Sequence, residues 1–320
     1  MKYSQNKRSV AIRLIQKASI FWALIGLIII MTILSPVFLT PRNIANVIKQ
    51  ITLNGILAIG MTTVILTGGI DLSVGSVVAL SSIVAAIFGK EGGGYPILVP
   101  IVLGILTGTA IGAINGFGVS YLRIPPFIVT LSTMTIVRGV ALLVTNGVPV
   151  FGLSAAMISL ANGTTLGLPN LIFFLLATFL IVLFLLNATV FGKRIYAVGG
   201  NEAAARYAGV NARGIKTAAY TICGFCAGLA GVLVASRITS GNPTTGDGYE
   251  LDAIAAAVIG GVSMSGGKGF LLGTIVGALI IGVVQNGLDI LGISTYYQDV
   301  IQGVIILVAV LVDIRNNAKE

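Results

Sequence analysis

The sequence predicts an all-α, polytopic membrane protein of about ten transmembrane helices. Of its 320 residues, 56% are hydrophobic and only 9% are charged, whereas a soluble domain carries about 25% charged residues. The chain also contains 42 glycines, which are common where membrane helices pack closely. Its apolar residues fall into long runs, and about 20 such residues are enough to cross a bilayer.

Charged residues, glycine clusters and prolines divide the apolar sequence into ten candidate spans. These spans are 18–35, 46–67, 73–89, 97–119, 126–145, 169–188, 215–237, 251–264, 269–287 and 298–312. The first follows a basic segment, as the core of a signal peptide would. However, its apolar run exceeds the ~7–15 residues of a signal peptide and no A-x-A site follows, so we expect an uncleaved span. The span 251–264 is short, so we expect it to be tilted, broken or part of a re-entrant hairpin.

The basic residues predict the orientation of these spans. Lys and Arg number 19 against 10 Asp and Glu, and most of them fall in segments on one side of the membrane, which the positive-inside rule places in the cytoplasm. We expect a single transmembrane domain over 1–320 with both termini cytoplasmic. Residues 1–17 form a basic cytoplasmic N-terminus, 189–214 a cytoplasmic loop and 146–168 an external segment. The net charge of +9 is therefore an orientation signal, and no nucleic-acid partner is expected.

Little in the sequence points to catalysis. The chain has no His, which excludes imidazole bases and ligands. Cys223 and Cys226 form a C-x-x-C pair inside a span, without a neighbouring cation to activate a thiol. A membrane thiol oxidoreductase stays a minor alternative. The Gly-Gly-Lys-Gly run ending at Gly269 lacks P-loop spacing because Val262 stands where the first Gly is required. We expect a tight cytoplasmic turn there and no nucleotide site in this chain.

A glycine repeat predicts close helix packing. Gly104, Gly108, Gly112 and Gly116 recur every four residues along one span, and such small residues let helix backbones approach in lipid. The repeat therefore predicts a tightly packed bundle and carries no information about a solute.

Several polar residues lie within or beside the spans, where they are costly and often functional. The ionisable ones are Asp71, Arg138 and Asp252. Two interpretations stay open for each. The carboxylates either cap helix N-termini or contact a solute, and Arg138 either lines a pathway or binds the carbonyls at the end of a helix. Neutral candidates for lining a pathway are Asn54, Thr62, Ser73, Ser76, Asn115 and Thr130.

The loop 189–214 contains the signal of a short helix. Asn201 is a suitable N-cap, Glu202 complements the positive end of the helix, and Gly209 can end it. The small side chains between them suit docking into a cleft of another protein. The alternative is an interfacial helix that lies on anionic lipid.

Three separated motifs carry a resemblance to a known family. They are Thr67–Leu80, Gly199–Val210, and Gly248–Gly261 with Ser265–Gly269. The chain resembles the permease subunits of ribose-type sugar ABC importers over nearly its whole length, and Gly292–Gln298 is particularly similar to ribose permeases. Tyr207-Ala208 stand where the family usually has Leu-Ser, and Val262 where it usually has Thr. These departures bear on the choice of sugar rather than on the family.

The resemblance implies an ABC-importer permease fold and ATP-driven import of a monosaccharide, ribose or a relative, across a bacterial inner membrane. It implies lipid around the bundle, a second permease subunit as a homodimer, cytoplasmic ATPase subunits, an external sugar-binding protein and no cofactor. It also implies a coupling helix that docks on the ATPase, with the residues Asn201, Glu202, Ala204, Ala205, Arg206 and Gly209. An ion-coupled secondary transporter, with Asp71 as its intramembrane carboxylate, is the alternative function.

Overall fold

The computed structural model describes residues 20–317, so the predicted N-terminal segment 1–17 lies outside the described residues. The first described helix is Ile20–Leu34. The elements that follow are α2 (Pro41–Leu66), α3 (Val74–Phe88), α4 (Leu98–Ser120), α5 (Pro126–Thr145), α6 (Ala155–Asn162), β1 (Thr164–Thr165), β2 (Leu168–Pro169), α7 (Leu171–Ala188), α8 (Val190–Gly200), α9 (Glu202–Tyr207), α10 (Ala212–Ile238), α11 (Tyr249–Ile259), α12 (Leu271–Ile290) and α13 (Thr295–Asn317). The prediction of an all-α protein is confirmed, because β1 and β2 form only a two-residue antiparallel hairpin.

The helices agree with the predicted spans. Within the described part of the chain, seven helices are long and apolar enough to cross a membrane: α2, α4, α5, α7, α10, α12 and α13. Two shorter apolar helices, Ile20–Leu34 and α3, correspond to the predicted spans 18–35 and 73–89. The short span 251–264 contains α11, which has only 11 residues. The protein is therefore a polytopic membrane protein.

Some boundaries differ from the predicted ones. α2 starts at Pro41 rather than at residue 46, because a proline in the first turn of a helix has its φ preset and no N–H to lose. α13 continues to Asn317, past residue 312. The loop 189–214 holds two helices instead of one, since α8 precedes α9 and is capped by the Thr189 side chain, which accepts from Gly192 N–H.

The core of the bundle consists of α2 and α10. The best apolar windows of these two helices are 83% and 78% buried, whereas those of α5 and α7 are only 17% and 22% buried. The glycine repeat of α4 lies against α10: a Cβ atom on Gly108 would be 2.4 Å from the Gly224 carbonyl oxygen, and one on Gly112 would be 2.4 Å from that of Tyr220. The predicted close packing is confirmed. The exposed apolar faces of α5 and α7 suit contact with lipid.

Two non-helical segments lie inside the bundle, namely 67–73 before α3 and 239–248 before α11. The second segment contacts the first turn of α3, where a Cβ atom on Gly75 would be 2.1 Å from the carbonyl oxygen of Gly246. Irregular backbone at membrane depth is tolerated where protein surrounds it and satisfies its polar groups. Arg138 of α5 does so here, since its Nη1 donates to the carbonyl oxygens of Pro243 (2.6 Å) and Thr245 (2.8 Å).

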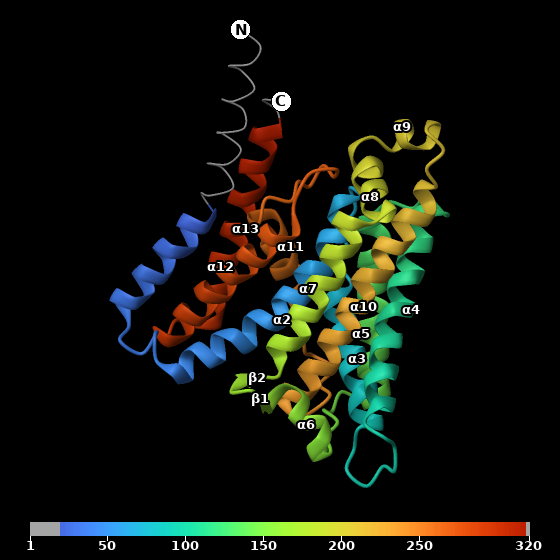
Figure 1. The fold of residues 1–320 in the computed structure, drawn as a ribbon. Helices are drawn as coiled ribbons and strands as arrows, with labels where there is room; N and C mark the ends of the chain where they lie inside the picture. Colours follow the sequence, from blue (N-terminus) through green and yellow to red (C-terminus); the bar gives the residue numbers. More distant parts are fainter. Residues whose placement is uncertain (1–19, 318–320) are drawn as a thin grey trace.

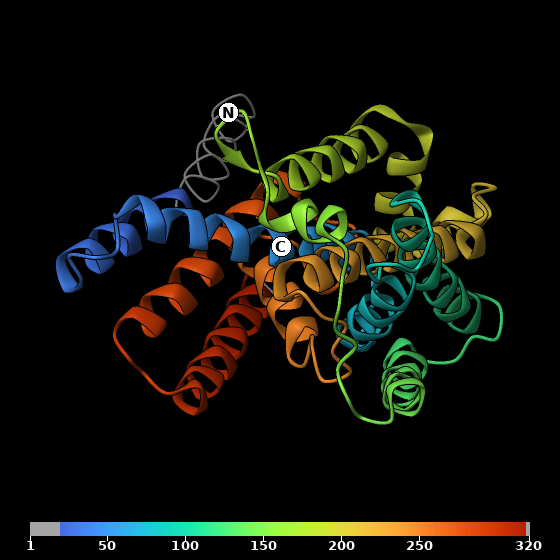
Figure 2. The same ribbon diagram turned by 90° about the horizontal axis from the view of Figure 1, so that it is seen from below.

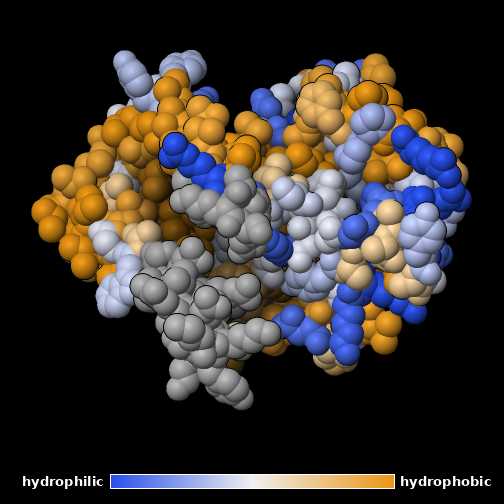
Figure 3. Space-filling model, turned by 90° about the horizontal axis from the view of Figure 1, so that it is seen from above, coloured by the Kyte–Doolittle hydropathy of each residue, from blue (hydrophilic) through white to orange (hydrophobic). Residues whose placement is uncertain are grey.

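The loops fall at two ends of the bundle (Figure 1). α8, α9 and the last described turn of α13 lie at one end, and α6 with the β1–β2 hairpin lies at the other. Seen from below, α12 and α13 lie to one side and α4 and α5 to the other (Figure 2). Figure 3 views the end that carries α9, where hydrophilic residues gather over the half that contains α8 to α10. The segments 146–168 and 189–214 are thus at opposite ends, as a transmembrane topology requires.

Candidate coupling helix and solute cavity

α9 is a short helix whose two ends are both closed by the residues that the sequence indicated. The Asn201 side chain caps it by accepting from the Ala204 N–H at 2.9 Å. At the other end, Gly209 has φ +82°, where a residue with a Cβ is strained. Its N–H donates to the Arg206 carbonyl at 2.9 Å. The backbone of α9 is therefore fixed without help from a partner.

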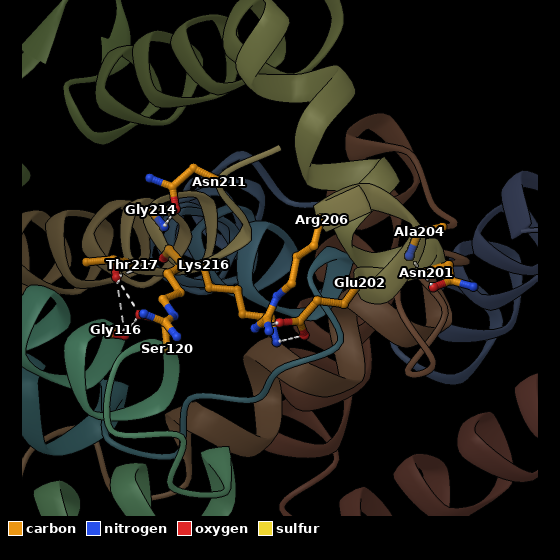
Figure 4. Close-up of polar contacts among 11 residues, drawn as sticks. Gly116, Ser120, Asn201, Glu202, Ala204, Arg206, Asn211, Gly214, Lys216 and Thr217 are labelled. Atoms are coloured by element: carbon orange, nitrogen blue, oxygen red, sulfur yellow. Dashed lines mark hydrogen bonds and ion pairs between the residues drawn. The ribbon is translucent and has the colours of Figure 1, made fainter. Parts of the chain in front are cut away.

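Glu202 joins α9 to the start of α10 (Figure 4). Its carboxylate forms an ion pair with Arg206 one turn on and a second with Lys216 of α10. Partial burial raises the pKa of Glu202, but the hydrogen bonds and charges of Lys216 and Arg206 outweigh it and leave the pKa below its ordinary value. Glu202 is therefore ionised at neutral pH and serves chiefly to hold α9 in place.

The outward face of α9 is exposed, and few other parts of the chain cover it. Ala204, Arg206 and Gly209 are exposed, and the Tyr207 side chain is 94% exposed. Ala205, by contrast, is buried and packs on the main core. Of the residues carried over from the resemblance, Ala205 thus contacts the bundle, while the others form or flank a surface open to a partner.

The base of this surface is tied to the membrane helices (Figure 4). Asn211 caps α10 by accepting from the Gly214 N–H at 3.1 Å. One turn further along, the Thr217 hydroxyl contacts the Ser120 hydroxyl of α4 at 2.7 Å and donates to the Gly116 carbonyl at 3.3 Å. α9 is thus connected, through Lys216 and the start of α10, to the tightly packed pair α4 and α10.

The glycine-rich loop 263–269 lies beside α8 at the same end of the bundle. The Gly267 N–H donates to the carbonyl of Leu66, the last residue of α2, at 3.0 Å. The Ser263 N–H donates to the Lys268 carbonyl at 2.9 Å. The loop forms the tight turn that was predicted, and its backbone packs against Gly199.

A cavity of about 510 Å³ lies between α2, α11, α12 and α13, and it contains two of the predicted pathway residues, Asn54 and Asp252. The Asp252 carboxylate accepts hydrogen bonds from the Nε2 atoms of Gln285 and Gln302. Gln285 Oε1 in turn accepts from Gln50 Nε2 at 3.1 Å and from Asn54 Nδ2 at 3.4 Å. The Asp252 carboxylate thus bonds to side chains of two neighbouring helices rather than to the backbone at the start of α11.

The other predicted pathway residues lie elsewhere. Asp71 Oδ1 accepts from the Ser73 N–H (2.9 Å) and the Ser73 hydroxyl (2.6 Å), and Asn115 Nδ2 donates to that hydroxyl at 2.8 Å. All three residues are almost fully buried at the start of α3. Asp71 thus binds the N-cap residue Ser73 in a local turn, and it makes no cap hydrogen bond to the first turn of α3. Arg138 binds carbonyls of the loop 239–248 rather than those at the end of a helix.

The structure adds residues that the sequence analysis did not single out. Gln285 and Gln302 complete the cavity cluster, and Tyr207 dominates the exposed face of α9. A usable signal was present for the two glutamines, since each is an uncharged polar residue within or beside an apolar span. The C-x-x-C pair lies as free thiols buried in α10, with Cys226 packed against Gly60 of α2.

A bundle of apolar spans that encloses a cavity with polar side chains is the arrangement expected of a membrane transport protein. The family model described as "Branched-chain amino acid transport system / permease component" matches residues 43–310. The chain belongs to this family of permease components.

Individual relatives match over nearly their whole length. The protein named ribose import permease of Bacillus subtilis (strain 168) is 45% identical over 305 residues, which is 95% of this chain and 94% of the relative. The ribose import permease of Escherichia coli (strain K12) is 47% identical over 91% of each chain. The D-allose transport system permease protein of the same strain is 39% identical over 92% of this chain and 93% of its own. No solved structure gives a significant match.

Proposed function

We propose that this chain is the membrane-spanning permease subunit of an ATP-driven ABC importer, and that it carries ribose or a related monosaccharide into the cytoplasm. The observation that carries the proposal is the 45% and 47% identity to two ribose import permeases over more than nine-tenths of each chain. A further relative is named for allose, another neutral monosaccharide.

The lining of the cavity supports a sugar over the branched-chain amino acid in the description of the family. A branched aliphatic side chain would need an apolar pocket. The cavity has aliphatic residues such as Ile281 and Leu288 in its lining, but it also presents the Asp252 carboxylate and the amides of Asn54, Gln285 and Gln302. These groups are suited to hydroxyls, which both donate and accept hydrogen bonds.

The proposal includes partners. α9 docks on a cytoplasmic ATPase subunit. We assign ATP hydrolysis to that subunit because this chain has no P-loop sequence. An external binding protein delivers the sugar. Two copies of the permease form the pore in a bacterial inner membrane, with both termini in the cytoplasm. The exposed surface of α9 and its tie to α4 and α10 support a coupling role. The ion-coupled alternative has less support, because Asp71 is enclosed by Ser73 and Asn115.

The test is uptake of radiolabelled ribose into proteoliposomes that contain the permease with its ATPase, with the binding protein added outside. We expect uptake to require ATP on the ATPase side and to be unchanged when ion gradients are collapsed with ionophores. Uptake that follows an ion gradient without ATP would overturn the proposal in favour of the secondary transporter.

The coupling role has its own test. Gly209→Val places a β-branched residue at φ +82°, which costs about 1–2 kcal/mol. We expect it to distort the end of α9 and weaken ATPase binding about ten-fold, which corresponds to ~1.4 kcal/mol. The matched control is Gly92→Val, since Gly92 has φ +76° and open space around it at the opposite end of the bundle. Equal ATPase binding by the two variants would contradict the assignment of α9.

A further inference from the structure

The Asp252 carboxylate stands at the centre of a hydrogen-bond cluster that spans three helices. Gln302 of α13 donates to Oδ1 at 2.7 Å. Gln285 of α12 donates to Oδ1 at 2.9 Å and to Oδ2 at 3.0 Å. Asp252 itself is on α11, and only 5% of its surface is exposed. The cluster therefore joins α11, α12 and α13 through groups that face one cavity.

The cluster retains capacity for another donor. A carboxylate has about four acceptor positions, and three N–H···O contacts from the described residues reach Asp252. Gln302 is only partly buried, so its amide can turn to a ligand without disturbing the packed core. A ligand with adjacent hydroxyls can therefore donate to Asp252 while it accepts from Gln302.

The composition of the lining disfavours anions. The described residues of the lining contain more side-chain carboxyls than basic groups. Arg237 is the basic residue among them. An excess of negative charge repels anions. No group of three or more His, Cys, Asp or Glu residues converges as a metal site among residues 20–317, so the cavity also lacks the ligand set of a metal ion. Amides that both donate and accept suit hydroxyl groups.

The cavity lies in the half of the bundle away from α9. Its lining includes Gln50 near the start of α2, Ile238 at the end of α10 and Thr295 at the start of α13, and these helix ends lie on the side opposite α9 (Figure 1). A solute in this cavity is on the side from which an importer receives it.

We propose that Asp252, Gln285 and Gln302 form a binding station for a neutral monosaccharide in the outer half of the permease, in which Asp252 accepts from a sugar hydroxyl and Gln302 contacts the neighbouring one. This inference rests on the proposed function. The permease then selects for hydroxyl-rich, uncharged solutes in addition to any selection by a binding protein, and it excludes sugar phosphates and sugar acids.

The first test is Asp252→Asn in the assembled transporter, with Glu91→Gln as the matched control because Glu91 is an exposed carboxylate in the loop after α3. We expect Asp252→Asn to reduce ribose uptake about ten-fold, since a hydrogen bond to a charged acceptor is worth about that factor. ATP hydrolysis stimulated by the loaded binding protein should stay within two-fold of wild type, because the substitution is distant from the surface that docks the ATPase. Wild-type uptake by Asp252→Asn would overturn the inference.

The second test reports binding directly and guards against a variant that folds poorly. A cysteine placed at Ile301, which lines the cavity, is labelled with a membrane-impermeant thiosulfonate, while the native Cys223 and Cys226 are buried. We expect ribose to slow this labelling several-fold and ribose 5-phosphate or NaCl at the same concentration to leave it unchanged. Addition of Asp252→Asn should abolish the protection. Protection that survives Asp252→Asn, or that NaCl alone provides, would overturn the inference.

The two proposals fail in different ways. If wild-type transporter takes up no ribose with ATP present, the proposed function fails. If it takes up ribose normally and the Asp252→Asn variant does so too, only the binding station fails.

Discussion

Glu202 shows how a single side chain positions a docking surface. It serves as the first-turn acid of α9 and at the same time as the partner of Lys216 in α10. Because both cations stabilise its ionised form, the pKa of the carboxyl group is held below its ordinary value despite partial burial. The position of α9 therefore depends on a charge that is present at all physiological pH values.

This dependence has a defined pH window. A carboxyl group with a lowered folded-state pKa stabilises the fold above its ordinary value of 4.5, and the contribution is lost as pH falls through the folded-state value. We expect amide-exchange protection factors in α9 to be constant from pH 7 to about pH 5 and to fall at lower pH. Because the ion pairs are partly exposed, the loss is less than about 1 kcal/mol.

The control is Glu202→Gln, which should lower protection in α9 at neutral pH and remove most of the pH dependence. Lys216→Met should lower protection at neutral pH as well. A wild-type protein whose α9 protection does not change on acidification, or a Glu202→Gln variant that keeps the full acid response, would contradict this account.

At the scale of elements, the contact of α4 with α10 determines the stability of the bundle. Gly108 and Gly112 of α4 face Gly224 of α10 so closely that backbone atoms occupy the space of the missing Cβ atoms. In lipid, such contacts stabilise helix pairs through dispersion, because burial from lipid adds little hydrophobic free energy.

We expect Gly112→Ala to destabilise the protein by about 1–3 kcal/mol, the usual cost of overpacking. The measurement is thermal unfolding in detergent. Gly139→Ala on α5 is the matched control, because a Cβ atom there meets no other atom within 4 Å, and it should leave the unfolding temperature unchanged or slightly higher. Equal unfolding temperatures for the two variants would refute the packing argument.

The sequence was enough to predict most of the membrane helices, but it did not predict how these helices pack together. Hydropathy located the spans, with 126–145 coinciding with α5, because membrane helices are long apolar runs. It did not bring Asp252, Gln285 and Gln302 together, since which face of α12 or α13 meets α11 depends on packing between distant segments. Arg138 could be seen as intramembrane but not as the donor to the loop at Pro243, because that loop enters the bundle through tertiary contacts.

At the scale of the whole molecule, the two ends of the bundle carry different structural elements. One end carries α8, α9 and the loop 263–269, and the other carries α6 and the β1–β2 hairpin. This asymmetry matches the predicted topology, in which most basic residues lie on the α9 side. The assignment of that side to the cytoplasm is a prediction that labelling can test.

We expect a cysteine at Leu166, which is 91% exposed in the hairpin, to react with an impermeant thiol reagent in intact cells. A cysteine at Tyr207, on α9, should react only after the membrane is permeabilised. The wild-type chain is the control, since both of its cysteines are buried. Labelling of Tyr207→Cys in intact cells would show that the predicted topology is inverted.

The short length of α11 has a consequence for biogenesis. Its 11 residues extend about 16 Å at 1.5 Å per residue, roughly half of the ~30 Å hydrocarbon layer. α11 cannot leave the translocon as an independent segment, because the backbone at its ends would face lipid without hydrogen-bond partners. We expect it to enter the bilayer together with α12 and to pack against α2, both of which it contacts in the bundle. On this expectation, the cavity that contains Asp252 forms late in biogenesis.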